Sequence, residues 1–269
     1  MSASGSYFAT AGDDIKIWDS TSLQIVKQYN YHKGNVKDLA WNRDNSIICS
    51  TSASGDKLLL AGIQLNQVDK PKIIAEHAVD ENQTCVRISH SGRKMYSGGM
   101  GGDVNVWDRE TGQLKKAFKD THSSPVTCIA LNETETHVVS GSNKGDVVIR
   151  NLSSNTTSKP HFKSEGHAVR SMIFSPWSHS LVGMAMDDGT LHLHDTLQST
   201  TYHSFHEIHK APAMSIAFSN FNELLFASVG LDKKLIIYDV NRKKSLNKAS
   251  LEQPLTSVGF LLDGVTLIA

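Results

Sequence analysis

Histidines crowd one short stretch of the chain. His192 and His194 are two residues apart, so on a strand both imidazoles point to one face. With His203, His206 and His209 nearby, they offer the nitrogen ligands that zinc and copper take in proteins. No cysteine at metal-ligand spacing and no patterned carboxylate accompanies them. His194 and His209 also fall at regular positions of a sequence repeat, described below, which gives both a structural role. The sequence therefore favours structural histidines over a metal site, and we predict neither a metal nor a cofactor.

Glycines are concentrated at Gly98, Gly99, Gly101 and Gly102, as they are in phosphate-binding loops. Such a loop leads into a helix and carries a following Lys and Ser or Thr, and this run has neither. The run is instead typical of a hairpin between two strands. Serine, histidine and aspartate all occur in the chain, but no nucleophile elbow or similar catalytic signature does. We predict that the protein is not an enzyme.

Composition limits the classes of partner. The 269 residues include 27 Lys plus Arg and 27 Asp plus Glu, so no overall field favours nucleic acid, membrane or acidic substrates. The N-terminus lacks a signal-peptide pattern, and no run of roughly 18 apolar residues occurs. Cys49, Cys85 and Cys128 lie in apolar runs and are expected to be reduced core thiols. We expect a soluble cytoplasmic protein with protein partners.

A repeat supplies the elements that must position these residues. GDDIKIWD ends at Trp18 and Asp19, and GGDVNVWD ends at Trp107 and Asp108. Weaker copies end at Leu60–Ala61, Arg150–Asn151, His194–Asp195 and Tyr238–Asp239. The first residue of each pair, which we term the slot residue, recurs in steps of 42, 47, 43, 44 and 44. These steps match the blade period of WD-repeat propellers, about 40 to 45 residues.

Each unit reads as a four-stranded antiparallel meander. Val104 and Val106, and again Leu191 and Leu193, alternate with other residues at period two, and no segment keeps a helical period. We predict an all-β WD-repeat β-propeller with six near-complete four-stranded blades and a partial seventh, as one domain over residues 1–269. The first repeat begins at its second strand, and the last repeat ends inside its second strand. We therefore expect a domain truncated at its C-terminus and a ring that this chain leaves unclosed.

A histidine precedes most slot residues by 27 to 30 positions. In WD-repeat blades this histidine, a Ser or Thr on the second strand, an Asp at the next turn and the slot Trp form a buried hydrogen-bonded chain. Each bond contributes about 1 kcal/mol net. We predict such structural roles for Trp18, Asp19, His77, Trp107, Asp108, His122, His167, His194, Asp195, His209, Asp232, Tyr238 and Asp239.

Several segments resemble one family over essentially the whole chain. They are GDDIKIWD (Gly12 to Asp19), TSASGDK (Thr51 to Lys57), QTCV (Gln83 to Val86), HKAPA (His209 to Ala213), NELLF (Asn222 to Phe226), GLDKKLIIYD (Gly230 to Asp239) and PLTSVGF (Pro254 to Phe260). They look like the N-terminal propeller of the GCP-WD family, the WD-repeat attachment factors of the γ-tubulin ring complex. The chain departs from the family pattern in two repeats. The second repeat lacks the Trp and Asp of its slot, and in the fourth repeat Arg150 and Asn151 replace that Trp–Asp pair.

The resemblance implies a scaffold that acts in mitosis. The family propeller helps to place the protein at centrosomes, spindle poles and spindle microtubules, and a later C-terminal region binds the γ-tubulin ring complex and permits microtubule nucleation. We therefore expect centrosomal or spindle proteins as partners, with the γ-tubulin ring complex bound through a region absent here. Two alternatives stay open: an adaptor of another assembly, such as a ubiquitin ligase substrate receptor, and a propeller hydrolase.

One surface is a candidate binding site. Aligning FSPWSHSLV with FSNFNELLF puts Trp177 and Phe221 at equivalent hairpin tips of neighbouring units. The loop that carries Arg242, Lys243 and Lys244 is expected on the same face. Aromatic anchors beside basic residues predict a docking patch for an acidic or amphipathic segment. In the alternative interpretation, both rings fold back onto their own blades and the basic run is a solvated turn.

Overall fold

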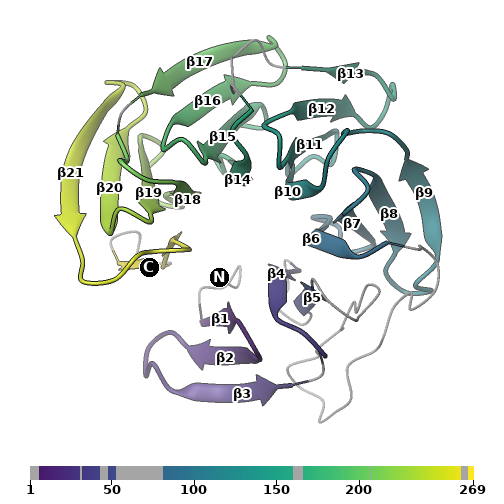
Figure 1. Ribbon diagram of the computed structural model, residues 1–269, viewed down its shortest axis with the longest axis horizontal. Helices are drawn as coiled ribbons and strands as arrows, with labels where there is room; N and C mark the ends of the chain where they lie inside the picture. The colour runs from purple at the N-terminus through teal and green to yellow at the C-terminus, as the bar shows by residue number, and fades with distance from the viewer. Residues whose placement is uncertain are drawn as a thin grey trace. The chain divides into compact units, whose positions relative to one another are not determined.

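The computed structural model describes residues 6–30, 32–42, 48–52, 81–159, 166–206, 208–261 and 266–269. All regular elements in these ranges are β-strands, which confirms the prediction of an all-β chain (Figure 1). A helix of the length and apolarity needed to cross a bilayer is therefore not found in this part of the chain. The chain divides into two compact units, residues 1–126 and 127–269.

The described residues of the first unit form three antiparallel sheets. Two sheets have three and four strands, in the orders β1-β2-β3 and β6-β7-β8-β9, and β4 pairs with β5. The strands are β1 (Tyr7–Ala11), β2 (Ile15–Asp19), β3 (Ile25–Tyr29), β4 (Val36–Trp41), β5 (Ile48–Ser52), β6 (Gln83–Ile88), β7 (Lys94–Gly99), β8 (Val104–Asp108) and β9 (Leu114–Phe118). The Gly98 to Gly102 run forms the hairpin between β7 and β8, as its sequence predicts.

Where the second unit is described, it contains three four-stranded meanders and one two-stranded sheet. The strands are β10 (Val126–Leu131), β11 (His137–Ser142), β12 (Val147–Asn151), β13 (Thr157–Ser158), β14 (Val169–Phe174), β15 (Leu181–Met186), β16 (Leu191–Asp195), β17 (Thr200–Phe205), β18 (Ala213–Phe218), β19 (Leu225–Gly230), β20 (Lys234–Asp239), β21 (Lys244–Ser250), β22 (Gly259–Phe260) and β23 (Leu267–Ile268). The sheets stand side by side like blades, with β10, β14 and β18 innermost and β13, β17 and β21 outermost (Figure 1).

The blades are those of a WD-repeat propeller, but their number corrects the prediction. Among the described residues, five sheets have three or four strands, whereas six near-complete blades were expected. The second repeat accounts for the difference, because only β4 and β5 of it are described. Its expected slot at Leu60 and Ala61 lies outside the described residues. This is also the repeat that lacks Trp and Asp at its slot.

Slot residues occupy the same position in each described blade. Within the third strand they pair across to the second strand, as Trp18 with Phe8, Trp107 with Met95, and Tyr238 with Phe226. On the other side, the ladder to the fourth strand shifts register directly before Trp18, Trp107, His194 and Tyr238. Such a bulge bends the strand locally. The sequence period of the repeat therefore reflects one recurrent backbone geometry.

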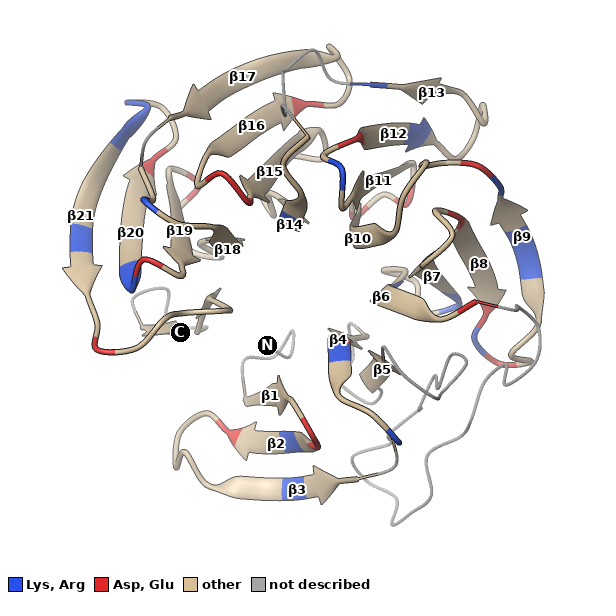
Figure 2. Ribbon diagram, in the orientation of Figure 1, with Lys and Arg blue, Asp and Glu red and all other residues tan. Residues whose placement is uncertain are grey.

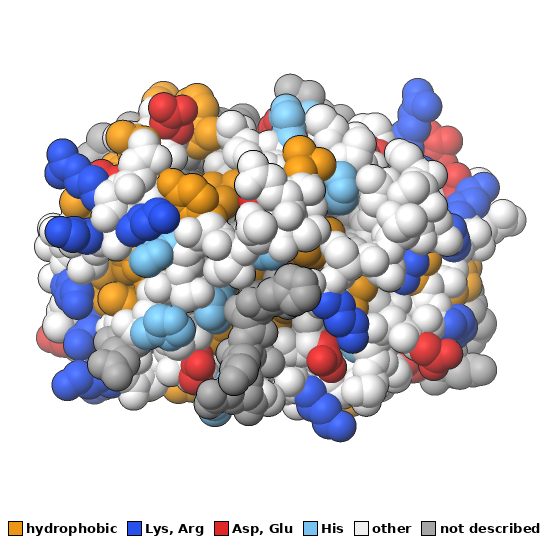
Figure 3. All heavy atoms as spheres, turned by 90° about the horizontal axis from the view of Figure 1, so that it is seen from above, with side chains coloured by type: hydrophobic (Ala, Val, Ile, Leu, Met, Phe, Trp, Pro, Cys, Tyr) orange, Lys and Arg blue, Asp and Glu red, His pale blue; other side chains and the backbone are white. Residues whose placement is uncertain are grey.

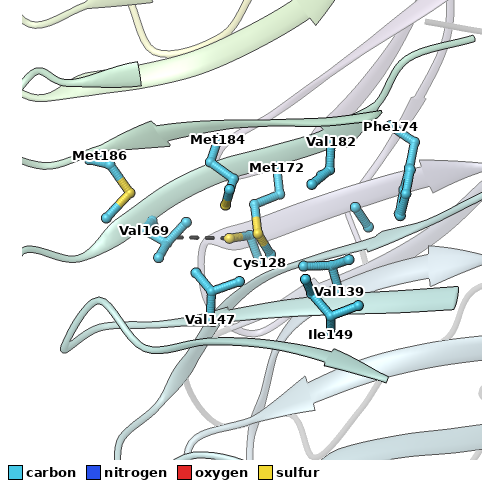
Figure 4. Packing of buried hydrophobic residues seen from close by; sticks show 11 residues of the cluster. Cys128, Val139, Val147, Ile149, Val169, Met172, Phe174, Val182, Met184 and Met186 are labelled. Carbon is cyan, nitrogen blue, oxygen red and sulfur yellow. Dashed lines mark hydrogen bonds between the residues drawn. The ribbon is translucent and has the colours of Figure 1, made fainter. Parts of the chain in front are cut away.

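Apolar side chains from facing sheets hold the blades of the second unit together. Cys128, Val139, Val169, Met172 and Met184 belong to one cluster, and its labelled residues point toward one another between neighbouring sheets (Figure 4). Gly141 allows this close approach, because a Cβ there would lie 2.8 Å from Cβ of Val169. The cysteines are free and buried, as the sequence predicts, and in the first unit burial raises the pKa of Cys49 to about 12.

Candidate functional site

In the five slot pairs that the structure describes, the last residue caps the turn between the third and fourth strands. One side-chain oxygen accepts backbone N–H bonds from the residues two and three positions later, as Asp195 does from Leu197 and Gln198. Asp19, Asp108 and Asn151 make the same two bonds, and Asp239 accepts the N–H of Arg242. These backbone bonds lower the pKa of Asp19 and of Asp108. Because Asn151 also offers an oxygen, its departure from the WD pattern keeps the turn.

A hydroxyl on the second strand recurs with the slot residue. Thr10, Ser50, Ser97, Ser140 and Ser228 hold this position, and Met184 replaces them in the blade β14–β17. Trp18 Nε1 donates to Thr10 Oγ1 at 3.0 Å, and Trp107 Nε1 donates to Ser97 Oγ at 2.7 Å. In both blades with a slot tryptophan, the second-strand hydroxyl thus accepts the hydrogen bond from the indole N–H.

The blade β18–β21 carries the complete chain that the repeat predicts. His209 Nε2 lies 2.7 Å from Ser228 Oγ, which lies 2.8 Å from the Tyr238 hydroxyl. On its other side, His209 Nδ1 lies 2.8 Å from Asp232 Oδ1. Burial raises the pKa of Asp232, but the bonds from His209 and from the Lys210 backbone outweigh it, so the pKa is lowered. Burial raises the pKa of Tyr238, which keeps the phenol protonated.

The blade β6–β9 uses a residue that the spacing does not predict. Ser97 Oγ donates to Gln83 Oε1 at 2.6 Å, and Asn105 Nδ2 donates to the same oxygen at 3.2 Å. The predicted partner, His77, lies outside the described residues. Gln83 opens the first strand of the blade, so a glutamine amide bonds the serine that is the partner of the slot tryptophan.

The blade β14–β17 departs furthest from the prediction. His167 is exposed, where a buried histidine is expected. In the same blade, Met184 stands at the position where the other blades have a hydroxyl. His194 occupies the slot and is fully buried. His192 Nδ1 lies 2.7 Å from Ser204 Oγ, and burial lowers the pKa of His192 to about 4.

The other histidines of this stretch have separate surroundings. The His206 ring meets His192 edge-on at 6.3 Å between centroids, while His203 packs on Phe205 and His209 is bonded within the next blade. Within the described ranges, no three His, Cys, Asp or Glu side chains group closely enough to hold a metal ion.

Two histidines of the first unit, His32 and His122, also precede slot positions of the repeat. His122 is buried, and its backbone N–H donates to the carbonyl of Gly102 at 3.0 Å. His32 was not among the predicted residues, yet its Nε2 lies 2.7 Å from the buried Ser50 Oγ. The signal was available in the sequence, since 60 − 32 gives a spacing of 28 from the second slot position.

Trp177 and Phe221 lie at equivalent hairpin tips, between β14 and β15 and between β18 and β19. Trp177 is 49% exposed and Phe221 is 59% exposed. Trp177 Nε1 donates to the carbonyl of Ser219 at 2.8 Å, two residues before Phe221. The indole of Trp177 therefore binds the neighbouring blade. The alternative interpretation of the sequence placed this ring against its own blade.

Arg242 and Lys243 lie in the turn from β20 to β21, and Lys244 is the first residue of β21 (Figure 2). Val240 at the start of this turn donates its N–H to the carbonyl of Leu224, so the turn adjoins the hairpin that carries Phe221. Lys243 Nζ lies 4.6 Å from the centre of the Tyr202 ring and 3.3 Å from the Tyr202 carbonyl, on the outer strand β17. Arg242 and Lys244 are exposed. Sequence reasoning missed Leu197, an exposed apolar residue in the equivalent turn of the preceding blade.

Comparison with known proteins agrees with the repeat. Residues 23–59, 71–108 and 112–151 match the family described as WD domain, G-beta repeat. The chain is 36% identical to Protein NEDD1 of Homo sapiens over 262 residues, which are 97% of this chain and 39% of that protein. The figures for Protein NEDD1 of Bos taurus are 35%, 97% and 39%. Actin-interacting protein 1 of Drosophila melanogaster is 25% identical over 195 residues, 70% of this chain and 30% of that protein.

Proposed function

We propose that this chain is a non-enzymatic scaffold for protein partners, because it belongs to the WD-repeat proteins and because 97% of the chain is similar to Protein NEDD1. The similarity over 97% of the chain carries the proposal, and it supports the GCP-WD resemblance drawn from the sequence. The chemistry of the slots supports it as well. Where titratable and hydroxyl groups are buried together, as at His209 and Ser228, they bond one another and hold strands.

The finer proposal concerns the setting in which the scaffold acts. By the GCP-WD resemblance, we propose a centrosomal and spindle location and a part in bringing the γ-tubulin ring complex to sites of microtubule nucleation. The chain spans 39% of the length of the NEDD1 proteins. Contact with the γ-tubulin ring complex is accordingly proposed for a region outside this chain, and the propeller is proposed to supply the placement.

Affinity capture tests both levels. The chain is expressed with a small tag in dividing cells and captured under mild salt, and its partners are identified by mass spectrometry. The variant Lys210→Glu, which changes one exposed residue, is captured in parallel as a matched control. Recovery of centrosomal and spindle proteins is the expected result. Recovery of ubiquitin ligase subunits without centrosomal proteins would establish the adaptor alternative instead. Hydrolase activity of the purified chain against ester and phosphoester substrates would contradict the non-enzymatic role.

A further inference from the structure

Four loops of two adjacent blades make one surface in the second unit. Trp177 and Leu197 lie on loops of the blade β14–β17, and their loops are joined because Thr196 N donates to the carbonyl of Ser180 at 2.9 Å. Phe221 and the Arg242–Lys243 turn lie on the next blade and are joined by the equivalent bond from Val240 to Leu224 at 2.7 Å. We term these five residues, Trp177, Leu197, Phe221, Arg242 and Lys243, the rim patch.

The two blades hold each other at this surface from both sides. Trp177 of the earlier blade donates to Ser219 of the later one, and Lys243 of the later blade packs on Tyr202 of the earlier one. Trp177 is therefore fixed before any partner arrives, so little conformational entropy remains to be lost on binding. Its N–H already has an acceptor, so the exposed indole presents apolar surface. The neighbouring Phe221, at 59%, and Leu197, at 70%, are exposed too.

The charges of the rim patch favour an acidic partner. Asp195 and Asp239 turn an oxygen toward the backbone of their own turns, which leaves Glu223 as the exposed carboxylate on the Phe221 hairpin. Arg242 and Lys243 carry the opposite charge. Arg242 Nε lies 3.7 Å from Asp239 Oδ2, but 76% of the Arg242 side chain is exposed, so its remaining N–H groups are available to a partner. An arginine fork binds a carboxylate in two parallel hydrogen bonds, and Lys243 retains donors beyond its bond to Tyr202. Lys and Arg side chains lie beside hydrophobic ones over β17 and β21 (Figure 3).

Resting on the proposed scaffold function, we infer that the rim patch is the docking site for a short acidic segment of a partner protein. The segment carries large apolar side chains that pack on Trp177, Leu197 and Phe221. Its carboxylates bind Arg242 and Lys243. Apolar anchors bordered by charged pairs are the usual composition of an energetic centre in a protein interface. The basic pair gives the site its preference for acidic sequences.

A display library of random 12-residue peptides tests the inference on the purified chain. The test variant combines Phe221→Ala, Arg242→Glu and Lys243→Glu. The control combines Leu251→Ala, Lys210→Glu and Lys248→Glu, which changes the same residue classes at other exposed positions. Peptides selected on the wild-type chain are expected to be rich in Asp or Glu together with Trp, Phe or Leu. One such peptide should bind the test variant at least about tenfold more weakly in fluorescence anisotropy, and the control unchanged.

Each other outcome overturns the inference. These outcomes are no enrichment, enrichment for basic peptides, and equal binding to the test variant. If the triple variant does not fold, as judged by circular dichroism, the single changes Phe221→Ala and Arg242→Glu replace it, since both side chains are largely exposed. Capture from cells separates the two proposals. Centrosomal partners that bind wild type and test variant equally refute the rim patch alone, whereas their absence from wild-type capture refutes the proposed function.

Discussion

Two adjacent blades of the second unit solve the same structural problem with different chemistry. In β18–β21, His209, Ser228 and Tyr238 form a buried hydrogen-bonded chain that ends at Asp232. In β14–β17, Met184 occupies the hydroxyl position and the corresponding histidine, His167, is exposed. Both blades nevertheless keep four strands and the same bulge beside the slot. The difference shows that backbone pairing and apolar packing define the blade, while the polar chain is one way of filling its interior.

The slot residue provides the largest test of this comparison. Tyr238 is fully buried, stacks on Phe226 at 4.5 Å and contacts Phe205, so Tyr238→Ala should lower the free energy of unfolding by about 3–5 kcal/mol. His194→Ala should cost less, because a smaller ring leaves a smaller cavity. Urea denaturation measures both, with Tyr238→Phe, which removes one hydroxyl, expected to cost about 1 kcal/mol. Equal costs for the two alanine variants would show that the slots are energetically alike.

Acidification should affect the two blades in different pH ranges. The pKa of His192 is about 4 in the folded chain and 6.5 when exposed, so the unfolded chain binds more protons between these values. Stability should therefore fall as the pH drops from 6.5 to 4, by at most about 3 kcal/mol. Asp232, whose pKa is lowered from 3.8, adds its loss only below that value. Urea midpoints measured across this range should fall less steeply for His192→Gln, and an unaltered slope would disprove the assignment.

Equivalent histidines should respond differently to the same substitution. His209→Ala leaves Ser228 and Asp232 without their shared partner, so it should cost about 2–3 kcal/mol. His167→Ala removes an exposed side chain and should change stability by less than about 0.5 kcal/mol. Thermal unfolding of both variants measures the difference. A comparable loss in melting temperature would mean that His167 supports its blade after all.

The turn caps should give the smallest effect, and the same one in both blades. Asp195 and Asp239 each act through an oxygen that accepts backbone N–H bonds, a task that Asn151 performs in the preceding blade. Asp195→Asn and Asp239→Asn should therefore change the free energy of unfolding by less than about 0.5 kcal/mol, and the alanine variants by about 1 kcal/mol. Loss of several kcal/mol on the asparagine change would show that the carboxylate charge is required.

Much of the fold follows from local patterns. Alternation at period two predicts strands, and the recurrence of the slot pairs predicts the meanders, because both depend on residues close in sequence. The turn caps are local for the same reason. The partner of a buried hydroxyl is less local: Gln83 binds Ser97 in the blade β6–β9, a contact that the histidine spacing does not predict. Spacing also points to His167, which is exposed in the blade where Met184 takes the hydroxyl position.

The sequence by itself determined the all-β class, the period of the blades and the aromatic and basic residues of a candidate surface. The tertiary structure decided which side chains meet across blades, because residues some 40 positions apart come into contact only after the sheets pack. The indole of Trp177 bound to Ser219, and Lys243 over Tyr202, are contacts of this kind. They turn separate hairpin tips into one surface, since the hydrogen bond and the cation–π contact fix each loop against its neighbour.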